Sequence, residues 1–436
     1  MTQTHKTYHR QQRGSPRRQT SSSPNETYQM IVLSGGKVYG ILPDPANNNN
    51  SHTSEPRFVD VVVAGTKILT LLEPSKTHSF IDGLRSNSIK VLRINVENQI
   101  IMPGLIDVHV HAIGGGGEQG PYSRTPESRL SQLISAGLTT IVGILGTDGI
   151  TRSLLSLLQK LKSLEYDGLS TFMWTGSYRM PIVTVTGSLH SDLLLVDKVI
   201  GAGEIALSDH RSSWPNFDEL VHLISDARVS GMLSGKAGVI HFHLGSSPSR
   251  LDLLWKILNE TTIPIRQMYL THMASRGELL IDEAKRWLKQ GGVCDFTADS
   301  DEQNETATID TLNTFRNQKL PLSQITVSSD AYGSLPEYDR EGRLISYGMS
   351  LPVFTLKTIQ NLVLKYQWPI EEAIQFSTAN PAKYLNFNKK GFIAIDYDAD
   401  ILILNQTDLT PLYVLGKGQI LKTPTWIKRD MFEHIS

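Results

Sequence analysis

The stretch PGLIDVHVHAIGGGGEQG, residues 103–120, marks the point at which the pattern of the chain changes. Before it, short alternating or β-branched runs are separated by turns that contain glycine, which is typical of β-strands. After it, apolar runs alternate with helical stretches, and the run inside the quoted stretch is the first of eight. The eight runs cover residues 105–111, 139–148, 170–179, 204–211, 238–245, 267–274, 292–300 and 325–334. Buried parallel strands have this continuous apolar character, so the sequence predicts a (β/α)8 barrel.

The two ends of the chain differ from the barrel region. Residues 28–102 and 389–436 contain short strand-like runs, and we expect them to pair into one small β domain beside a barrel over 103–388. The first 25 residues are basic, lack acidic side chains and have almost nothing apolar to bury, so a disordered tail over 1–27 is predicted. A transit peptide is the alternative, although the segment has no amphipathic face. The polar stretch 47–55 predicts a flexible loop.

The composition excludes several classes of protein. The 436 residues carry a formal net charge of -1, which gives no general attraction to nucleic acid or to a membrane surface. No apolar run reaches the roughly 18 residues that a membrane-spanning helix needs. The only cysteine, Cys294, rules out an internal disulfide and suits a reducing compartment, so we expect a cytoplasmic location.

Polar residues gather where the predicted barrel strands end, which is where such barrels carry their active sites. These residues are His109, His111, Thr147, Asp148, Tyr178, Arg179, Ser208 to Arg211, His243, His272 and Asp330. One histidine at a strand end is usually structural, and HxH alone is a weak signal. Several histidines and an aspartate brought together by a barrel favour a metal site. Imidazole and carboxylate ligands suit catalytic Zn²⁺, which lowers the pKa of bound water to roughly 7.

Strand alternation places His109 and His111 on one face, and likewise His241 and His243. His243 is taken as the ligand of the second pair because it lies nearer the strand end. His241 is interpreted as a residue behind the ligands or as a structural histidine.

Several motifs together resemble the amidohydrolase superfamily, and within it most closely the isoaspartyl dipeptidases. The motifs are PGxIDxHVHxxGGGGE from Pro103, LGTD, TGSY, SDHRS, the fifth-strand histidine, TH, SSDxxGS, TxNPA and DADILIL. The resemblance runs from about Tyr28 to the C-terminus. It implies a distorted (β/α)8 barrel with a small flanking β domain from both chain ends. It also implies hydrolysis of the β-aspartyl bond of dipeptides with release of aspartate, and a homo-oligomeric assembly.

The resemblance also implies two metal ions. The ligands carried over are His109, His111 and Asp330 for one ion, and His243 and His272 for the other. Asp330 would also act as general acid/base when a metal-bound hydroxide attacks. The family bridges its ions with a carboxylated lysine, but this chain has Glu204 at that position and Lys198 lies too far upstream. Two Zn²⁺ bridged by Glu204 are expected. A one-metal enzyme and an inactive relative are the alternatives.

The substrate contacts follow from the same resemblance. Glu118 would bind the ammonium group of the aspartyl residue, Arg211 a carboxylate by a two-point contact, and Tyr178 the scissile carbonyl. Four further positions complete the expected contacts: Gly116, Thr147, Arg276 and Ser334. THMASRG has one residue more between histidine and arginine than the family pattern, which shifts Arg276. The four glycines before Glu118 allow close approach of backbone to a ligand, or form only a flexible turn.

Two rival functions remain from the sequence. Another metal-dependent amide hydrolase, such as an N-acyl amino acid deacylase or a cyclic amidase, would use the same metals, and only Glu118, Tyr178 and Arg211 argue against it. A non-catalytic scaffold of the same fold would be expected to lose metal ligands, whereas here only the bridging residue is changed.

Overall fold

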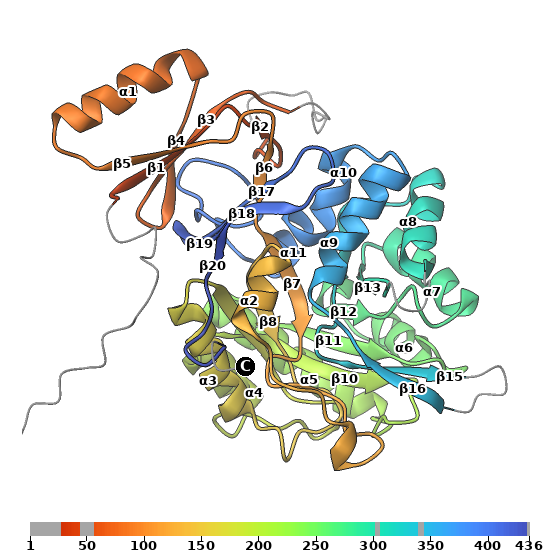
Figure 1. The fold of residues 1–436 in the computed structure, drawn as a ribbon. Helices are drawn as coiled ribbons and strands as arrows, with labels where there is room; N and C mark the ends of the chain where they lie inside the picture. Colours follow the sequence, from red (N-terminus) through yellow and green to blue (C-terminus); the bar gives the residue numbers. More distant parts are fainter. Residues whose placement is uncertain (1–27, 44–55, 301–305, 339–343, 434–436) are drawn as a thin grey trace, which may run out of the picture.

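The computed structural model describes residues 28–43, 56–300, 306–338 and 344–433, so the predicted tail over 1–27 and loop over 47–55 lie outside it. Its centre is a parallel sheet of eight strands in sequence order, and a bridge between Val110 and Ala331 brings its two edges together. The strands are β7 (Leu105–Val110), β8 (Leu138–Gly143), β9 (Ser170–Thr175), β10 (Val199–Leu207), β11 (Val239–Leu244), β12 (Met268–Thr271), β13 (Val293–Thr297) and β14 (Ile325–Ser328). The predicted barrel is therefore confirmed (Figure 1).

Helices follow the barrel strands and begin and end at residues suited to those positions. The Ser153 side chain caps α3 by accepting the Ser156 N–H, and Asn216 and Glu219 form a capping box at α5. Gly235, with φ of 69°, ends α5 in the left-handed conformation. The helices are α2 (Leu130–Ser135), α3 (Leu154–Tyr166), α4 (Leu189–Leu195), α5 (Phe217–Ser234), α6 (Asp252–Glu260), α7 (Glu278–Lys289), α8 (Ala307–Asn317), α9 (Val353–Gln360), α10 (Ile370–Ile374) and α11 (Ala379–Tyr384).

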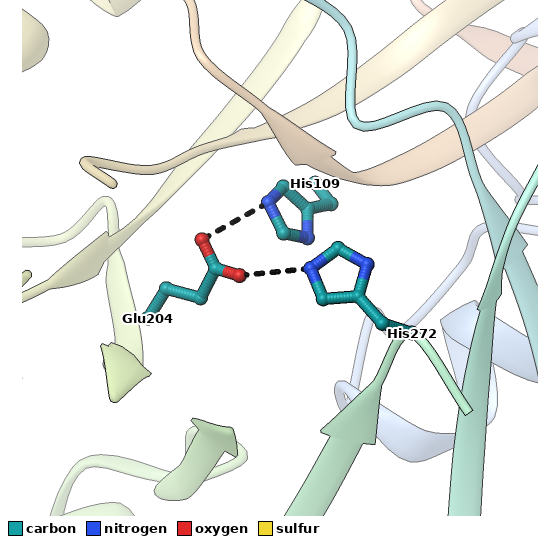
Figure 2. Close-up of side chains that lie close together, drawn as sticks. All are labelled: His109, Glu204 and His272. Carbon is teal, nitrogen blue, oxygen red and sulfur yellow. Dashed lines mark hydrogen bonds and ion pairs between the residues drawn. The ribbon is translucent and has the colours of Figure 1, made fainter. Parts of the chain in front are cut away.

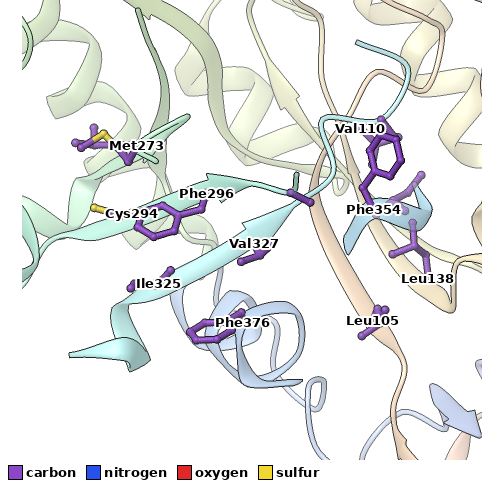
Figure 3. Close-up of a cluster of buried hydrophobic side chains, with 14 of the residues drawn as sticks. Leu105, Val110, Leu138, Met273, Cys294, Phe296, Ile325, Val327, Phe354 and Phe376 are labelled. Atoms are coloured by element: carbon purple, nitrogen blue, oxygen red, sulfur yellow. The ribbon is translucent and has the colours of Figure 1, made fainter. Parts of the chain in front are cut away.

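The core lies between the barrel strands and these helices. Apolar side chains of strands and helices pack there, as Phe296 of β13, Val327 of β14 and Phe376 do in Figure 3. Close packing of this kind gives the strand ends fixed positions. Within the described part of the chain, no helix has the length and apolarity to cross a membrane.

The strands of the two chain ends form two flanking sheets. A six-stranded sheet joins both chain ends in the order β2 (Lys37–Val38), β6 (Ile100–Pro103), β17 (Ile401–Leu404), β18 (Pro411–Gly416), β19 (Gln419–Thr423) and β20 (Trp426–Ile427). A four-stranded sheet uses N-terminal strands alone, in the order β4 (Lys67–Leu72), β3 (Asp60–Ala64), β1 (Met30–Ser34) and β5 (Val91–Asn95). The helix α1 (Pro74–Ser86), which the sequence did not predict, covers it through Ile81.

The fourth barrel strand differs from its prediction. β10 begins at Val199 rather than at Glu204, so Glu204 lies inside a strand and not at its start. The register of β10 against β11 shifts between Gly203 and Ile205. Such a bulge bends the strand and re-aims the side chain at that position. After β14 the chain forms a hairpin of β15 (Ser334–Tyr338) and β16 (Leu344–Met349) beside the barrel ends.

Candidate active site

A cavity of about 570 Å³ opens at the C-terminal ends of the barrel strands. Most of the predicted site residues line it. They are His111, Gly116, Glu118, Thr147, Tyr178, Arg211, His243, Arg276, Asp330 and Ser334. His109, Glu204 and His272 lie buried beneath them. The barrel thus brings together residues that are more than 200 positions apart in the chain.

The first cluster at the base of the cavity joins the start and the end of the barrel. His109 and His111 leave β7 on the same face, and both direct Nε2 at Oδ1 of Asp330, at 3.3 and 3.1 Å. Asp330 follows β14, and Gly333 leaves room for it because a Cβ there would lie 2.5 Å from its Oδ1. The three ligand atoms lie within 4.8 Å of one another, as one shared metal ion requires.

Glu204 connects this cluster to a second one. Its Oε2 lies 3.3 Å from His109 Nε2, while its Oε1 lies 3.2 Å from His272 Nε2 (Figure 2). The same Oε1 lies 2.7 Å from His243 Nδ1. Each carboxylate oxygen therefore faces a different set of histidines. The two clusters share His109, which contacts Glu204, and together they form a candidate binuclear metal site.

The polar atoms at this point fit divalent cations. In the described part of the chain, His109 Nε2, Glu204 Oε2 and Asp330 Oδ1 are buried without a hydrogen-bond partner, although they face one another. Burial lowers the pKa of His109, but the carboxylates of Glu204 and Asp330 outweigh it and raise that pKa to about 10. The centre therefore favours positive charge. Burial and His243 lower the pKa of His272 to about 3, which keeps this imidazole neutral and able to bind a metal.

The lining of the cavity also carries a carboxylate beside a guanidinium. Glu118 accepts hydrogen bonds from Thr147 Oγ1 at 3.1 Å and from Ser334 Oγ at 3.3 Å. Arg211 Nη1 lies 3.6 Å from Glu118 Oε1. The Arg211 guanidinium also lies over the Tyr178 ring, 5.2 Å from its centroid. An anion and a cation are thus held next to each other in the cavity that also contains the candidate metal ligands.

Tyr178 lies between the two sides. Its hydroxyl is 2.9 Å from His243 Nδ1, and burial raises its pKa well above 10, with Glu204 adding to that shift. The phenol therefore stays protonated at neutral pH and keeps a proton to donate.

Comparison with known proteins gives this geometry a context. The amidohydrolase family model matches residues 240–428. A beta-aspartyl dipeptidase from Fervidobacterium islandicum AW-1, solved in complex with a beta-Asp-Leu dipeptide, is 38% identical, with a TM-score of 0.81 over 93% of this chain and 100% of that one. The chain belongs to the beta-aspartyl dipeptidase family. A second structure of the Fervidobacterium enzyme matches at 37% identity and a TM-score of 0.80, again over 93% and 100% of the two chains.

More distant structures share only the fold of the beta-aspartyl dipeptidase family. Dihydropyrimidinase from Brevibacillus agri is 14% identical, with a TM-score of 0.57 over 92% of this chain and 96% of its own. The 38% identity to the Fervidobacterium enzyme confirms the resemblance to the dipeptidase family that the sequence motifs indicated.

The glycine loop of this family member is closely packed and hydrogen-bonded. Gly114 and Gly116 have φ of 79° and 69°, and a Cβ on Gly114 would lie 2.3 Å from the Thr125 carbonyl oxygen. Arg152, which is buried, donates hydrogen bonds to the carbonyls of Ile113, Gly115 and Thr125. The loop is therefore a hydrogen-bonded turn, and its positive φ angles favour glycine at these positions. Glu118 follows directly after this loop in the sequence.

Three residues that contact the candidate metal ligands were missed or left open by the sequence. His241 Nε2 lies 3.2 Å from His109 Nδ1, and its ring stacks on Trp174 at 5.0 Å and 8°. Thr297 Oγ1 lies 2.6 Å from His272 Nδ1. Asp209 Oδ2 lies 3.0 Å from His243 Nε2. The SDHR motif contained the signal for Asp209, whereas nothing in the sequence marks Thr297.

Proposed function

We propose that this protein hydrolyses the β-aspartyl bond of dipeptides and releases aspartate. The pair of Glu118 and Arg211, 3.6 Å apart, carries this proposal. A β-linked aspartyl residue has a free ammonium and a free carboxylate on the same carbon. Its recognition therefore needs an acceptor and a cationic donor side by side, as these two residues provide. The bound beta-Asp-Leu in the Fervidobacterium relative supports the same substrate class.

We infer that two Zn²⁺ ions occupy the buried clusters. His109, His111 and Asp330 would hold one, and His243 and His272 the other. Glu204 would bridge them, because its two oxygens already face the two sets of histidines. Such ions polarise a carbonyl and lower the pKa of water, which supplies a nucleophile at neutral pH.

In the proposed reaction, one side chain of the cavity transfers protons and three others bind the substrate. Asp330 is ionised, since His109 and His111 overcome the effect of burial and lower its pKa to about 2. It accepts the proton of the attacking water and passes it to the leaving amine. The Tyr178 hydroxyl donates a hydrogen bond to the oxygen of the β-carbonyl. Glu118 holds the ammonium group and Arg211 a carboxylate, so that the scissile bond faces Asp330.

The remaining contacts complete the proposed site. Gly116, Thr147 and Ser334 would approach the aspartyl head group, since the two hydroxyls already flank Glu118. Arg276 is exposed at the rim of the cavity, where it can reach the carboxylate of the second residue. We also propose domain boundaries at 103 and 388, a homo-oligomer and a cytoplasmic location. The single buried Cys294 is consistent with the last of these.

Aspartate release from β-Asp-Leu and from α-Asp-Leu, measured with Zn²⁺ present, tests the proposal. We expect strong preference for the β-linked peptide, because only that linkage leaves both head groups of the aspartyl residue free. Equal rates, or activity only toward an N-acyl amino acid or a cyclic amide, would reject it. Elemental analysis of the same protein should find about two ions per chain.

A further inference from the structure

Asp209 lies between the metal clusters and the substrate side of the cavity. It follows β10, and its side chain is buried. Its Oδ1 accepts hydrogen bonds from the main-chain N–H and the Nε of Arg211, at 2.8 and 2.9 Å. Its Oδ2 lies 3.0 Å from Arg211 Nη2 and 3.0 Å from His243 Nε2. One carboxylate thus contacts a histidine that faces Glu204 and the guanidinium that faces Glu118.

We propose that Asp209 is a positioning residue that sets both the metal-binding nitrogen of His243 and the direction of the Arg211 fork. A histidine that binds a metal through one nitrogen keeps its proton on the other. His243 directs Nδ1 at Glu204 Oε1, at 2.7 Å, so a metal ion held by this carboxylate would bind Nδ1 and leave the proton of His243 on Nε2. Asp209 Oδ2 is the acceptor for that proton. A carboxylate in this place also makes the imidazole a stronger ligand.

The same carboxylate orients Arg211. A guanidinium offers five N–H groups in a rigid plane. Asp209 engages Nε and Nη2, which turns the remaining Nη1 edge toward Glu118 and the cavity. Asp209 also offsets the charge of Arg211 next to His243, since Arg211 Nη2 lies only 3.2 Å from His243 Nε2. Metal binding and substrate binding should therefore weaken together when this one residue is changed.

The substrate half of this inference rests on the proposed dipeptidase function, and the metal half does not. Metal-free Asp209→Asn protein, titrated with Zn²⁺ against a competing chelator, measures the metal half. We expect the Kd for Zn²⁺ to rise roughly 10- to 100-fold, the range found when partners behind metal ligands are removed. An amide offers only one acceptor where His243 and Arg211 need two. At saturating Zn²⁺, the KM for β-Asp-Leu should rise as well. Asp209→Glu, which keeps both acceptors, should bind Zn²⁺ more tightly than Asp209→Asn.

Asp400→Asn is the matched control. Asp400 is also a buried aspartate paired with a cation, Lys390, but this pair contacts Ser170 at the start of β9, the opposite end of the barrel. The control should leave both the Kd for Zn²⁺ and the KM unchanged. An unchanged Kd in folded Asp209→Asn protein, or an equal rise in the control, overturns the proposal. Asp209→Ser supplies the same titration if the Asn variant does not fold. If the wild type does not cleave β-Asp-Leu, the proposed function fails, and the Zn²⁺ titration still decides the role of Asp209.

Discussion

Replacing Glu204 by glutamine is the most direct perturbation of the proposed binuclear centre. The change keeps the size and shape of the side chain and removes one negative charge. Glu204 is 1% exposed, so water cannot replace the lost charge. The free-energy effect should therefore be large.

The distances in the cluster give its magnitude. Glu204 Oε2 lies 3.3 Å from His109 Nε2, so a unit positive charge at such a distance interacts with the carboxylate by about 5 kcal/mol at an effective dielectric constant of 20. A tenfold change in affinity corresponds to about 1.4 kcal/mol, so we expect the affinity for Zn²⁺ to fall by roughly three to four powers of ten. The amide also has one oxygen and one NH₂ group, and the NH₂ group cannot ligate the second ion.

The assay is metal content by elemental analysis after dialysis, together with Zn²⁺ titration of the metal-free protein. We expect the Glu204→Gln variant to retain less metal than the wild type and to lose hydrolysis of β-Asp-Leu. Glu283→Gln is the control, because Glu283 is a buried glutamate of α7 that binds Trp255 and Arg286 far from the cavity. A Glu204→Gln protein that binds as many ions as the wild type, with the same affinity, would refute the bridging role.

Three further outcomes are expected. Removal of metal by a chelator should lower the Tm measured by calorimetry, and restoring Zn²⁺ should recover it. The reason is that an ion present at a hundred times its Kd stabilises the folded state by about 2.7 kcal/mol. An unchanged Tm would count against a buried ion. Glu118→Gln should lower kcat/KM for β-Asp-Leu by roughly 30-fold, the loss of a charged hydrogen bond of about 2 kcal/mol. The same change should spare N-succinyl-leucine, which lacks the ammonium group, and equal losses for both compounds would argue against ammonium binding. Gly114→Ala should lower Tm more than Gly65→Ala. Both glycines have positive φ, but only a Cβ at Gly114 would lie close to other atoms, among them the Thr125 carbonyl oxygen. Equal shifts of Tm would contradict a closely packed loop.

The barrel was predictable because each of its strands is an apolar run, and burial on both faces requires such runs. The strand-end residues were predictable for the same reason, since the ends of parallel strands meet at one face. His109 and Asp330 could thus be placed together although they are far apart in the chain. The separate four-stranded sheet and the helix over 74–86 were missed, because the way strands pair depends on long-range contacts that no local pattern contains.

The ligand-orienting residues show a second limit. Thr297 contacts His272. Threonine is common in β-strands, so its presence at a strand end does not indicate a functional role. His241 shares a sequence pattern with His243, and only their neighbours distinguish them: Trp174 and His109 surround the first, Glu204 and Asp209 the second. Alternation fixes the face of a side chain but not the atom that it meets, so the sequence alone could not separate the roles of His241 and His243.

Glu204 illustrates how a changed residue and a changed backbone can compensate for each other. Glutamate is shorter than a carboxylated lysine, so in a regular strand its oxygens would lie farther from the histidines. Here β10 extends back to Val199 and shifts register at Glu204, which places that residue in a bulge. The resulting contacts of 2.7 to 3.3 Å to three histidines show that the shorter side chain reaches both clusters. It follows that Glu204→Lys alone should not produce a bridged centre of the family type, because the longer side chain would have to fit the position that the bulge has already moved.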